Sequence, residues 1–448
     1  MRKSHTAIAI LIIASISLFA VGSFLYAVEP SLQVKWSQNY SEGYYDLLKS
    51  AEMTSDGGFI MAGIHSRSFY NASGSEVYLN DFWLQKVDSY GNLEWSKTYP
   101  STNDSSAYSV HQTTDGGFII AGMTGTTVIG LNSSFFLMKV DQNGNEEWNK
   151  TFLGGDLPWG YSVQTTDGGY ILTGGDGVHV IKTYSNGSLQ WSRSYSIFDS
   201  FSQAIIQTSD GGYIVLGYAE ATLQGFGEWL GIMLLKIDAM GNPQWNRTIA
   251  STEYAECFPS SILETSDGGY LVSGTTHRLA INNNNSLPTL ENSQAFLLKL
   301  YSNGTTQWND TFNTAETSTG MVVGQTSDGG YISTISAPWG LGSSDWLWKT
   351  DSNGKTLWYK PIGSTVSVFY LQQTADGDYV LAGYGIGVAG VLMKVSSSPP
   401  IFPPEVIPIL FIASGDCLVA LIVVGISLDL MSMQDQKKKQ DASSLPSR

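Results

Sequence analysis

The sequence predicts an all-β fold: a seven-bladed β-propeller closed by its N-terminal strand, followed by one C-terminal transmembrane helix. Three observations predict it. An Asp-Gly-Gly-aromatic block recurs seven times, once imperfectly, at an average interval of about 53 residues, which is typical of propeller blades. A second block, ending in tryptophan, follows each of the first six. Residues 30–398 lack the roughly 3.6-residue apolar periodicity of amphipathic helices.

Composition excludes several classes of protein. Of 448 residues, 42% are hydrophobic and 14% charged, which is too apolar for a disordered polymer and too polar for a multi-span transporter. The net charge of −16 excludes nucleic-acid binding, which requires a basic face. The two cysteines, Cys257 and Cys417, are far apart, which excludes a disulfide scaffold and a cysteine-rich metal site.

The N-terminus carries a membrane signal. Arg2 and Lys3 precede an apolar run from Ala7 to Val28. Residues 1–27 are therefore predicted to be a secretory signal peptide cleaved near Ala27, or alternatively an uncleaved anchor.

Residues 406–428 are predicted to form the transmembrane helix. At about 1.5 Å per residue they span about 35 Å, enough for the roughly 30 Å hydrocarbon core. Asp416 costs about 2.5–3.5 kcal/mol at the centre, which is offset by 14 Leu, Ile, Val and Phe residues at about 0.3–0.6 kcal/mol each. Alternatively, Asp416 marks an intramembrane polar partner.

The charges after this helix predict the topology. Lys437, Lys438 and Lys439 are expected to stay inside, so residues 429–448 form a cytoplasmic tail. Residues 396–405 form a Ser/Pro linker, and residues 30–395 form the ectodomain of a single-pass protein of the cell membrane. The ectodomain has ten Asn-x-Ser/Thr sites, so a glycoprotein is expected where the host has the machinery. These sites are Asn39, Asn71, Asn103, Asn132, Asn149, Asn186, Asn246, Asn284, Asn303 and Asn309.

The first repeated block predicts a β-hairpin. Threonine precedes each block by two positions, and an apolar run follows it, as in Phe118-Ile119-Ile120-Ala121-Gly122. This pattern predicts a strand, a tight glycine turn and a second strand. The seven block aspartates are Asp56, Asp115, Asp167, Asp210, Asp267, Asp328 and Asp376. Seven equivalent copies indicate a role in blade geometry rather than in catalysis.

The second block predicts another hairpin. It runs from Lys86 to Trp95 and again from Lys139 to Trp148, with a glycine at the turn that accepts positive φ. Two hairpins per repeat make a four-stranded sheet, and a radial stack of such sheets is a propeller.

The tryptophans predict how the ring closes. Six end the second hairpins: Trp95, Trp148, Trp191, Trp245, Trp308 and Trp358. The last repeat stops at Val395 without a tryptophan, whereas Trp36, in the segment from Leu32 to Tyr40, precedes the first block. The N-terminal strand is therefore expected to complete the seventh blade and cover its exposed edge. The recurring tryptophans are interpreted as packing wedges between blades.

These repeats resemble exported archaeal and bacterial surface proteins with Asp-Gly-Gly-Tyr repeats, within the quinoprotein-like propeller superfamily. The resemblance covers about 365 residues and implies the propeller fold. It leaves function open, because that superfamily includes dehydrogenases, assembly scaffolds and binding proteins. Quinone enzymes of this group use adjacent cysteines, which this sequence lacks, and sialidase-type propellers need three clustered arginines. No cofactor is therefore expected.

No metal site is expected either. The turns that begin at Asp141 and Asp351 could hold calcium, but their glycine stands at the fourth position rather than the sixth. We interpret these side chains as stabilising tight turns. His65, His111, His179 and His277 lie in different repeats without ligand spacing.

The predicted binding face is the one that carries the variable connections. These are Ser66–Asn80, Leu153–Gly160, Ser196–Ser200, Glu220–Gly231, Glu253–Phe258, Thr275–Ser293 and Ser336–Ser344. Loops on a rigid scaffold often carry function. Aromatic and acidic side chains in these loops suit carbohydrate or cationic peptides, although several aromatic residues could instead pack the loops themselves. The predicted ligand-binding residues are Trp159, Trp229, Trp339, Tyr254, Phe198 and Asp156.

The function predicted from the sequence is a membrane-anchored binding or adhesion module for carbohydrate or surface protein. Two alternatives stay open: a polysaccharide hydrolase that uses a pair of carboxylates on the loops, and a structural component of a surface layer.

Overall fold

A computed structural model describes most of residues 32–396. The described residues are 32–41, 46–70, 73–101, 103–125, 134–153, 161–197, 200–223, 227–249, 254–280, 289–312, 318–336, 345–362, 366–385 and 388–396. Within these ranges every regular element is a β-strand, and no helix could cross a membrane. The predicted signal segment 1–27, transmembrane helix 406–428 and tail 429–448 lie outside them. The chain divides into two compact units, Met1–Ser397 and Ser398–Arg448, and the described residues belong to the first.

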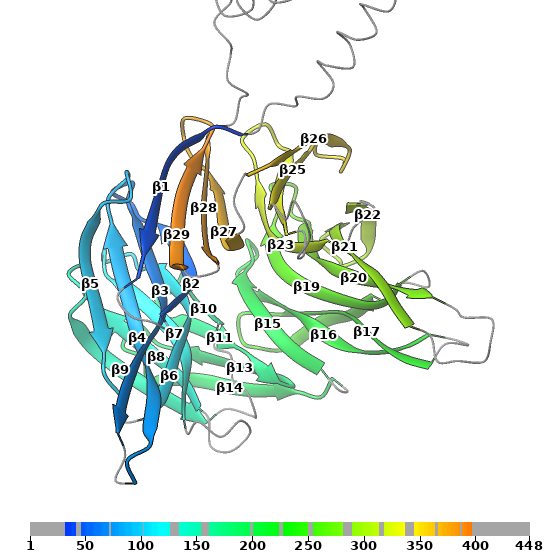
Figure 1. The fold of residues 1–448 in the computed structure, drawn as a ribbon. Coiled ribbons are helices and arrows are strands. Elements are labelled where there is room, and N and C mark those ends of the chain that lie inside the picture. Colours follow the sequence, from blue (N-terminus) through cyan, green and yellow to red (C-terminus); the bar gives the residue numbers. More distant parts are fainter. Residues whose placement is uncertain are drawn as a thin grey trace, which may run out of the picture. The chain divides into compact units, whose positions relative to one another are not determined.

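The described residues form seven antiparallel sheets, so the predicted all-β, seven-bladed propeller is confirmed (Figure 1). The first sheet contains β2 (Leu47–Met53), β3 (Phe59–Tyr70), β4 (Glu76–Val87) and β5 (Leu93–Tyr99). The second contains β6 (Asp104–Gln112), β7 (Phe118–Gly125), β8 (Ser134–Val140) and β9 (Glu146–Leu153). The third contains β10 (Tyr161–Gln164), β11 (Tyr170–Thr173), β13 (Val178–Thr183) and β14 (Leu189–Tyr195).

The remaining sheets follow the same order. The fourth contains β15 (Ser200–Gln207), β16 (Tyr213–Leu223), β17 (Gly227–Ile237) and β18 (Pro243–Ile249), with the short β12 (Gly175–Asp176) added beside β15. The fifth contains β19 (Tyr254–Glu264), β20 (Tyr270–Ala280), β21 (Thr289–Leu300) and β22 (Thr306–Phe312). The sixth contains β23 (Thr319–Gln325), β24 (Tyr331–Ser336), β25 (Trp346–Thr350) and β26 (Thr356–Pro361).

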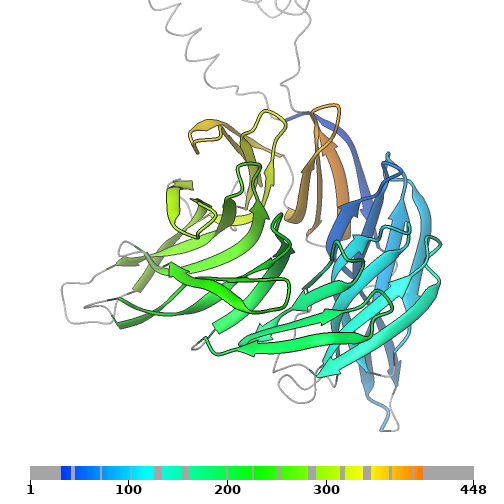
Figure 2. The same cartoon turned by 180° about the vertical axis from the view of Figure 1, so that it is seen from behind.

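The seventh sheet is built from both ends of the described chain. It contains β27 (Val366–Gln373), β28 (Tyr379–Gly385), β29 (Val388–Val395) and β1 (Val34–Tyr40). The strands β1 and β29 pair antiparallel, and they lie side by side in both views (Figures 1 and 2).

Two contacts at the end of this pair replace the tight turn of the other blades. The Ser396 amide donates to the Gln33 carbonyl at 2.9 Å. Lys35 forms an ion pair with Asp378, the residue that stands where the other blocks have their second glycine. The irregular seventh block therefore holds a carboxylate that faces the N-terminal strand.

The first strands of consecutive blades contact one another, from β2 to β6 and onward to β27, and β27 contacts β2. The first strand of each blade is therefore the inner one, and the fourth is the outer one. The apolar side chains between neighbouring sheets form separate clusters, such as the one that joins Ile120 of the second blade to Leu84 of the first.

Each outer-strand tryptophan packs against the next blade. In six places its ring centroid lies 5.7–6.5 Å from the aromatic residue of the next Asp-Gly-Gly block, as for Trp95 and Phe118 or Trp245 and Tyr270. Trp36 packs in the same cluster as Phe59 of the first blade. The tryptophans predicted to act as packing wedges all lie on outer strands and are partly buried.

The same indole rings cover the second turn of the next blade. At Gly304, which has a φ of +78°, a Cβ atom would lie 2.7 Å from the Trp245 ring. At Gly268, in the first turn of the same blade with a φ of +76°, a Cβ atom would meet nothing within 4 Å. The two glycines therefore differ in their contact with tryptophan and hardly at all in backbone conformation.

We expect Gly304→Ala to destabilise the protein more than Gly268→Ala. Both substitutions place alanine in the left-handed region, which costs about 1–2 kcal/mol. Only Gly304→Ala also pushes the Trp245 ring aside, which adds about 1–3 kcal/mol. Urea unfolding measures both losses. Equal losses would show that the tryptophan does not press on the turn.

Candidate functional site

The block aspartates are half-exposed, and each forms an ion pair with a lysine that is buried in six of the seven blades. The Lys Nζ to Asp Oδ2 distances are 2.6–3.1 Å in all seven blades. The lysines are Lys86, Lys139, Lys182, Lys236, Lys299, Lys349 and Lys394, and six of their side chains are at most 5% exposed. One of these lysines stands at the equivalent position of each repeat, just before the second hairpin turn or, in the last repeat, before Val395. Sequence reasoning gave them no role. Their recurrence seven times was the signal that could have found them.

The carboxylate is held by its own turn as well. In the fourth blade, Asp210 Oδ1 accepts hydrogen bonds from Thr208 Oγ1 at 2.6 Å and from the Gly212 amide at 2.9 Å. Glycine is required at position 212 because a Cβ atom there would lie 2.4 Å from the Ile237 carbonyl oxygen, and 2.5 Å from Lys236 Nζ. The Thr-x-Asp-Gly-Gly sequence therefore builds an ion-pair site within the turn.

The second turns are held by local hydrogen bonds. Asp141 Oδ1 accepts from the amides of Asn143 and Asn145, both at 2.8 Å, and Asp351 makes the equivalent pair with Asn353 and Lys355. This is the turn chemistry that the sequence indicated. In the described part of the chain, no group of three or more His, Cys, Asp or Glu could hold a metal ion.

Both tight turns of a blade lie at one end of its sheet, so the longer connections lie at the other end, which we call the loop face. Some of the predicted connections were too long. Residues of Ser66–Asn80 pair between β3 and β4 as far as Tyr70 and Glu76, and those of Glu220–Gly231 pair as far as Leu223 and Gly227. Strand pairing continues through these polar residues because the ladder uses backbone groups, whatever the side chains are.

The extended β3–β4 hairpin, which we call the arm, projects on the loop face (Figure 1). It carries exposed aromatic residues. Phe69, Tyr70 and Tyr78 are 41%, 74% and 45% exposed. Tyr78 pairs with Ser68, two residues before Tyr70, so the two tyrosines are diagonal neighbours on one side of the hairpin. The base of the arm is fixed, because Arg67 Nε donates to the buried Asp81 carboxylate at 2.6 Å.

A second group of aromatic residues spans the fourth and fifth blades and is packed rather than open. Phe201 stacks on Tyr218 at 5.3 Å, Tyr218 meets the edge of Phe258 at 5.7 Å, and Phe258 lies 5.5 Å from His277. Phe258 belongs to β19, although the sequence placed it in a connection. These rings pack mainly against one another between the two blades. This is the alternative named above, in which aromatic residues of this face pack the loops themselves.

Beside this group, Cys257 is buried and free. Burial raises the pKa of its thiol to about 11, with a smaller contribution from Glu256. The thiolate is therefore scarce near neutral pH, and Cys257 is not suited to be a nucleophile.

Six of the inner strands have a β-bulge at one equivalent position. On β2, Leu48 pairs with Gly63 and Ser50 with Ala62, which leaves Lys49 unpaired between them. The equivalent bulges leave Tyr108, Gln203, Ser260, Met321 and Phe369 outside the ladder. We call these six residues the axial ring. All are at least partly exposed, whereas the residues just before them are buried.

In five of these six blades a glycine of the second strand lies opposite the bulge, whereas in the sixth blade Ile335 takes this place. A Cβ atom at Gly63 would lie 2.0 Å from the Leu47 carbonyl oxygen, and one at Gly122 would lie 2.0 Å from that of Ser106. This glycine follows the block aromatic by four residues, as in Phe118 to Gly122, so the signal for the bulge is present in the sequence. Sequence reasoning missed the axial ring because it gave this glycine no role of its own.

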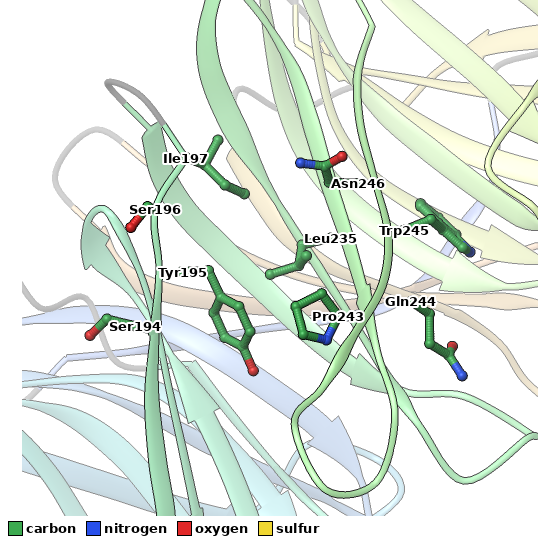
Figure 3. A pocket seen from close by; sticks show the side chains of 9 residues that line it. All are labelled: Ser194, Tyr195, Ser196, Ile197, Leu235, Pro243, Gln244, Trp245 and Asn246. Carbon is green, nitrogen blue, oxygen red and sulfur yellow. The ribbon is translucent and has the colours of Figure 1, made fainter.

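A groove of about 500 Å³ lies between the outer strands of the third and fourth blades (Figure 3). Tyr195 and Trp245 contribute aromatic rings, but no charged side chain lines it. The Tyr195 hydroxyl already donates to the Gly241 carbonyl at 2.7 Å. The groove is a gap between neighbouring blades and contains none of the predicted ligand-binding residues.

The six predicted ligand-binding residues are not brought together by the described structure. Trp159, Trp339, Phe198 and Asp156 lie outside the described residues. The backbone of Trp229 belongs to β17 and that of Tyr254 begins β19, but their side chains are also outside the described part. All six stay predictions.

No family model matches the sequence, and no curated protein matches it. Among solved structures, the chain is similar to a catalytically inactive virginiamycin B lyase from Staphylococcus aureus with quinupristin. The two are 11% identical with a TM-score of 0.50, covering 83% of this chain and 100% of that one. The chain is also similar to a streptogramin B lyase, with 10% identity and a TM-score of 0.44, covering 81% of this chain and 97% of that one. A protein of unknown function from Dyadobacter fermentans is 9% identical with a TM-score of 0.46, covering 82% of this chain and 99% of that one. At these identities the likeness shows the fold alone.

We expect the two sides of the buried ion pair to respond unequally to mutation. Asp210→Ala leaves the Lys236 ammonium buried without a carboxylate and should cost roughly 2–4 kcal/mol of unfolding free energy. Lys236→Met leaves Asp210 half in water with its turn hydrogen bonds, so about 1 kcal/mol is expected. Urea unfolding compares the two variants. A larger loss for Lys236→Met would contradict this account.

The same aspartates predict acid sensitivity. Burial raises the pKa of Asp328, but hydrogen bonds from Thr326 and Gly330 and the Lys349 ammonium together lower it from 3.8 to about 2. A depressed pKa adds stability that is present above about pH 4 and lost as the pH falls toward about 2. Unfolding free energies measured across this range should fall, and the fall should be shallower in Asp328→Asn. An unchanged slope in the variant would rule out this contribution.

Proposed function

We propose that this protein is a single-pass cell-surface propeller that binds carbohydrate on its loop face. The observation that carries the proposal is the arm, where Tyr70 and Tyr78 expose two neighbouring rings on a fixed hairpin. Exposed apolar surface of this kind marks interaction sites, and aromatic faces suit the apolar face of a sugar ring.

The rigidity of the arm supports a binding role. Arg67 joins the hairpin to the body, since its guanidinium also donates to the Ser101 carbonyl at 2.5 Å. Side chains on such a support lose little freedom on binding, which favours affinity. The net charge of −16 repels anionic surfaces. It therefore favours ligands that are neutral, or that are attracted by a positive charge close to the site.

The remaining parts of the proposal come from the sequence. Residues 1–27 export the chain, residues 406–428 anchor it, and the ten glycosylation sites belong to the exported part. The pairing of β1 with β29 is proposed to close the ring, supported by the Lys35 ion pair to Asp378. The superfamily resemblance fits a binding module as well as it fits an enzyme.

We expect Tyr70→Ala and Tyr78→Ala each to weaken carbohydrate binding by about tenfold, because each removes one stacking ring. Tyr90→Ala is the matched control: Tyr90 is 68% exposed in the same blade, but it lies in a tight turn at the opposite end of the sheet. A glycan array probed with the full chain identifies the ligand, and titration gives the affinities.

Four results would contradict the proposal. Equal losses in Tyr90→Ala would show that the loop face is not the binding face. Binding to surface proteins without glycan would favour adhesion to protein. Cleavage of the bound polysaccharide, or lateral assembly of the pure chain, would favour the hydrolase or the surface-layer alternative.

A further inference from the structure

The axial ring brings together side chains from different blades. Lys49 Nζ of the first blade lies 4.7 Å from the centre of the Tyr108 ring of the second. Tyr108 in turn lies 6.4 Å from Tyr161 at the start of the inner strand of the third blade. One ammonium and two phenol rings thus form a continuous contact along three inner strands.

Lys49 makes no ion pair with any described carboxylate. The two acidic residues nearest to it in sequence are engaged by histidines: Asp46 Oδ1 lies 2.8 Å from His65 Nδ1, and Glu52 Oε2 lies 2.5 Å from His111 Nδ1. Glu52 also accepts from the Gln112 amide at 3.1 Å. Lys49 is partly buried, and this burial lowers the pKa of its ammonium from the ordinary value.

The contrast with the other repeated lysines is informative. Seven lysines in this chain sit beside a block aspartate at 3.1 Å or less. Lys49 has an aromatic ring as its neighbour instead, which stabilises a cation by less than a carboxylate does. A partly desolvated ammonium held this way attracts an anion more strongly than one in water.

A second member of the axial ring has unused hydrogen-bonding capacity. Gln203 Oε1 is buried and has no hydrogen-bond partner among the described residues. A buried acceptor without a donor is costly, and a bound hydroxyl group would satisfy it.

We propose that the axial ring is a subsite for a carboxylate-bearing sugar, with Lys49 binding the carboxylate, Tyr108 and Tyr161 contacting the ring, and Gln203 accepting from a hydroxyl group. This inference rests on the proposed carbohydrate-binding function and names the class of sugar. The β-bulges provide the site, because on six inner strands they leave a variable, partly exposed residue outside the ladder while the residue before it stays buried.

The test is a titration of the full chain with trigalacturonate and with the neutral galactotriose at low ionic strength. We expect the wild-type protein to bind the acidic trisaccharide about tenfold more tightly, the size of one charge-assisted hydrogen bond. Lys49→Met should remove this preference and Lys49→Arg should keep most of it. Raising the salt concentration should reduce the preference in the wild-type protein, which tests the charge without any mutation.

The outcomes separate this inference from the proposed function. If both sugars bind equally, or if the preference survives Lys49→Met, the axial subsite is wrong and the loop-face proposal stands. If neither sugar binds, the axial subsite is wrong, and the glycan array alone decides the loop-face proposal. If Tyr70→Ala weakens both sugars equally while Lys49→Met affects only the acidic one, both proposals are supported and the arm and the ring act separately.

Discussion

The contact of each outer-strand tryptophan with the next blade is the interaction on which the rest of the structure depends. A four-stranded sheet of this size cannot bury its two faces alone, so each blade needs its neighbours. The indole covers both a buried aromatic residue, such as Tyr270, and a turn glycine, such as Gly304, so one side chain joins the two hairpins of the next blade. Repeating this contact around the ring positions the inner strands and, through them, the axial ring.

Polar contacts make the same joints specific. In six places the residue before a block aspartate donates its amide to a glutamine or glutamate of the next blade at 2.7–3.1 Å, as Ser55 does to Gln112. Within each blade the lysine ion pair fixes the first turn. Apolar packing alone would tolerate a slip between blades, whereas these paired groups have one geometry.

The repeats made the architecture predictable from sequence, because a seven-fold pattern constrains strands, turns and sheet number together. The missing tryptophan of the last repeat also predicted that the strand carrying Trp36 pairs with β29. The ion pair of Lys236 and the bulge at Lys49 were not predicted, although both recur in the repeat, because burial and strand register appear only in three dimensions. The loop face was predicted least well. Polar residues there, including Ser66 and Glu220, form strands through backbone pairing that side-chain patterns do not report.

Native-state hydrogen exchange in the seventh sheet tests most directly whether the ring behaves as one closed unit. Amides shared by β1 and β29 should exchange with the same opening free energy as those between β19 and β20, because in a closed ring both pairs open only when the whole ring unfolds. Exchange of the β1 and β29 amides at a much lower free energy, with the β19 and β20 amides still protected, would contradict this and describe an arc of blades whose N-terminal strand is dispensable.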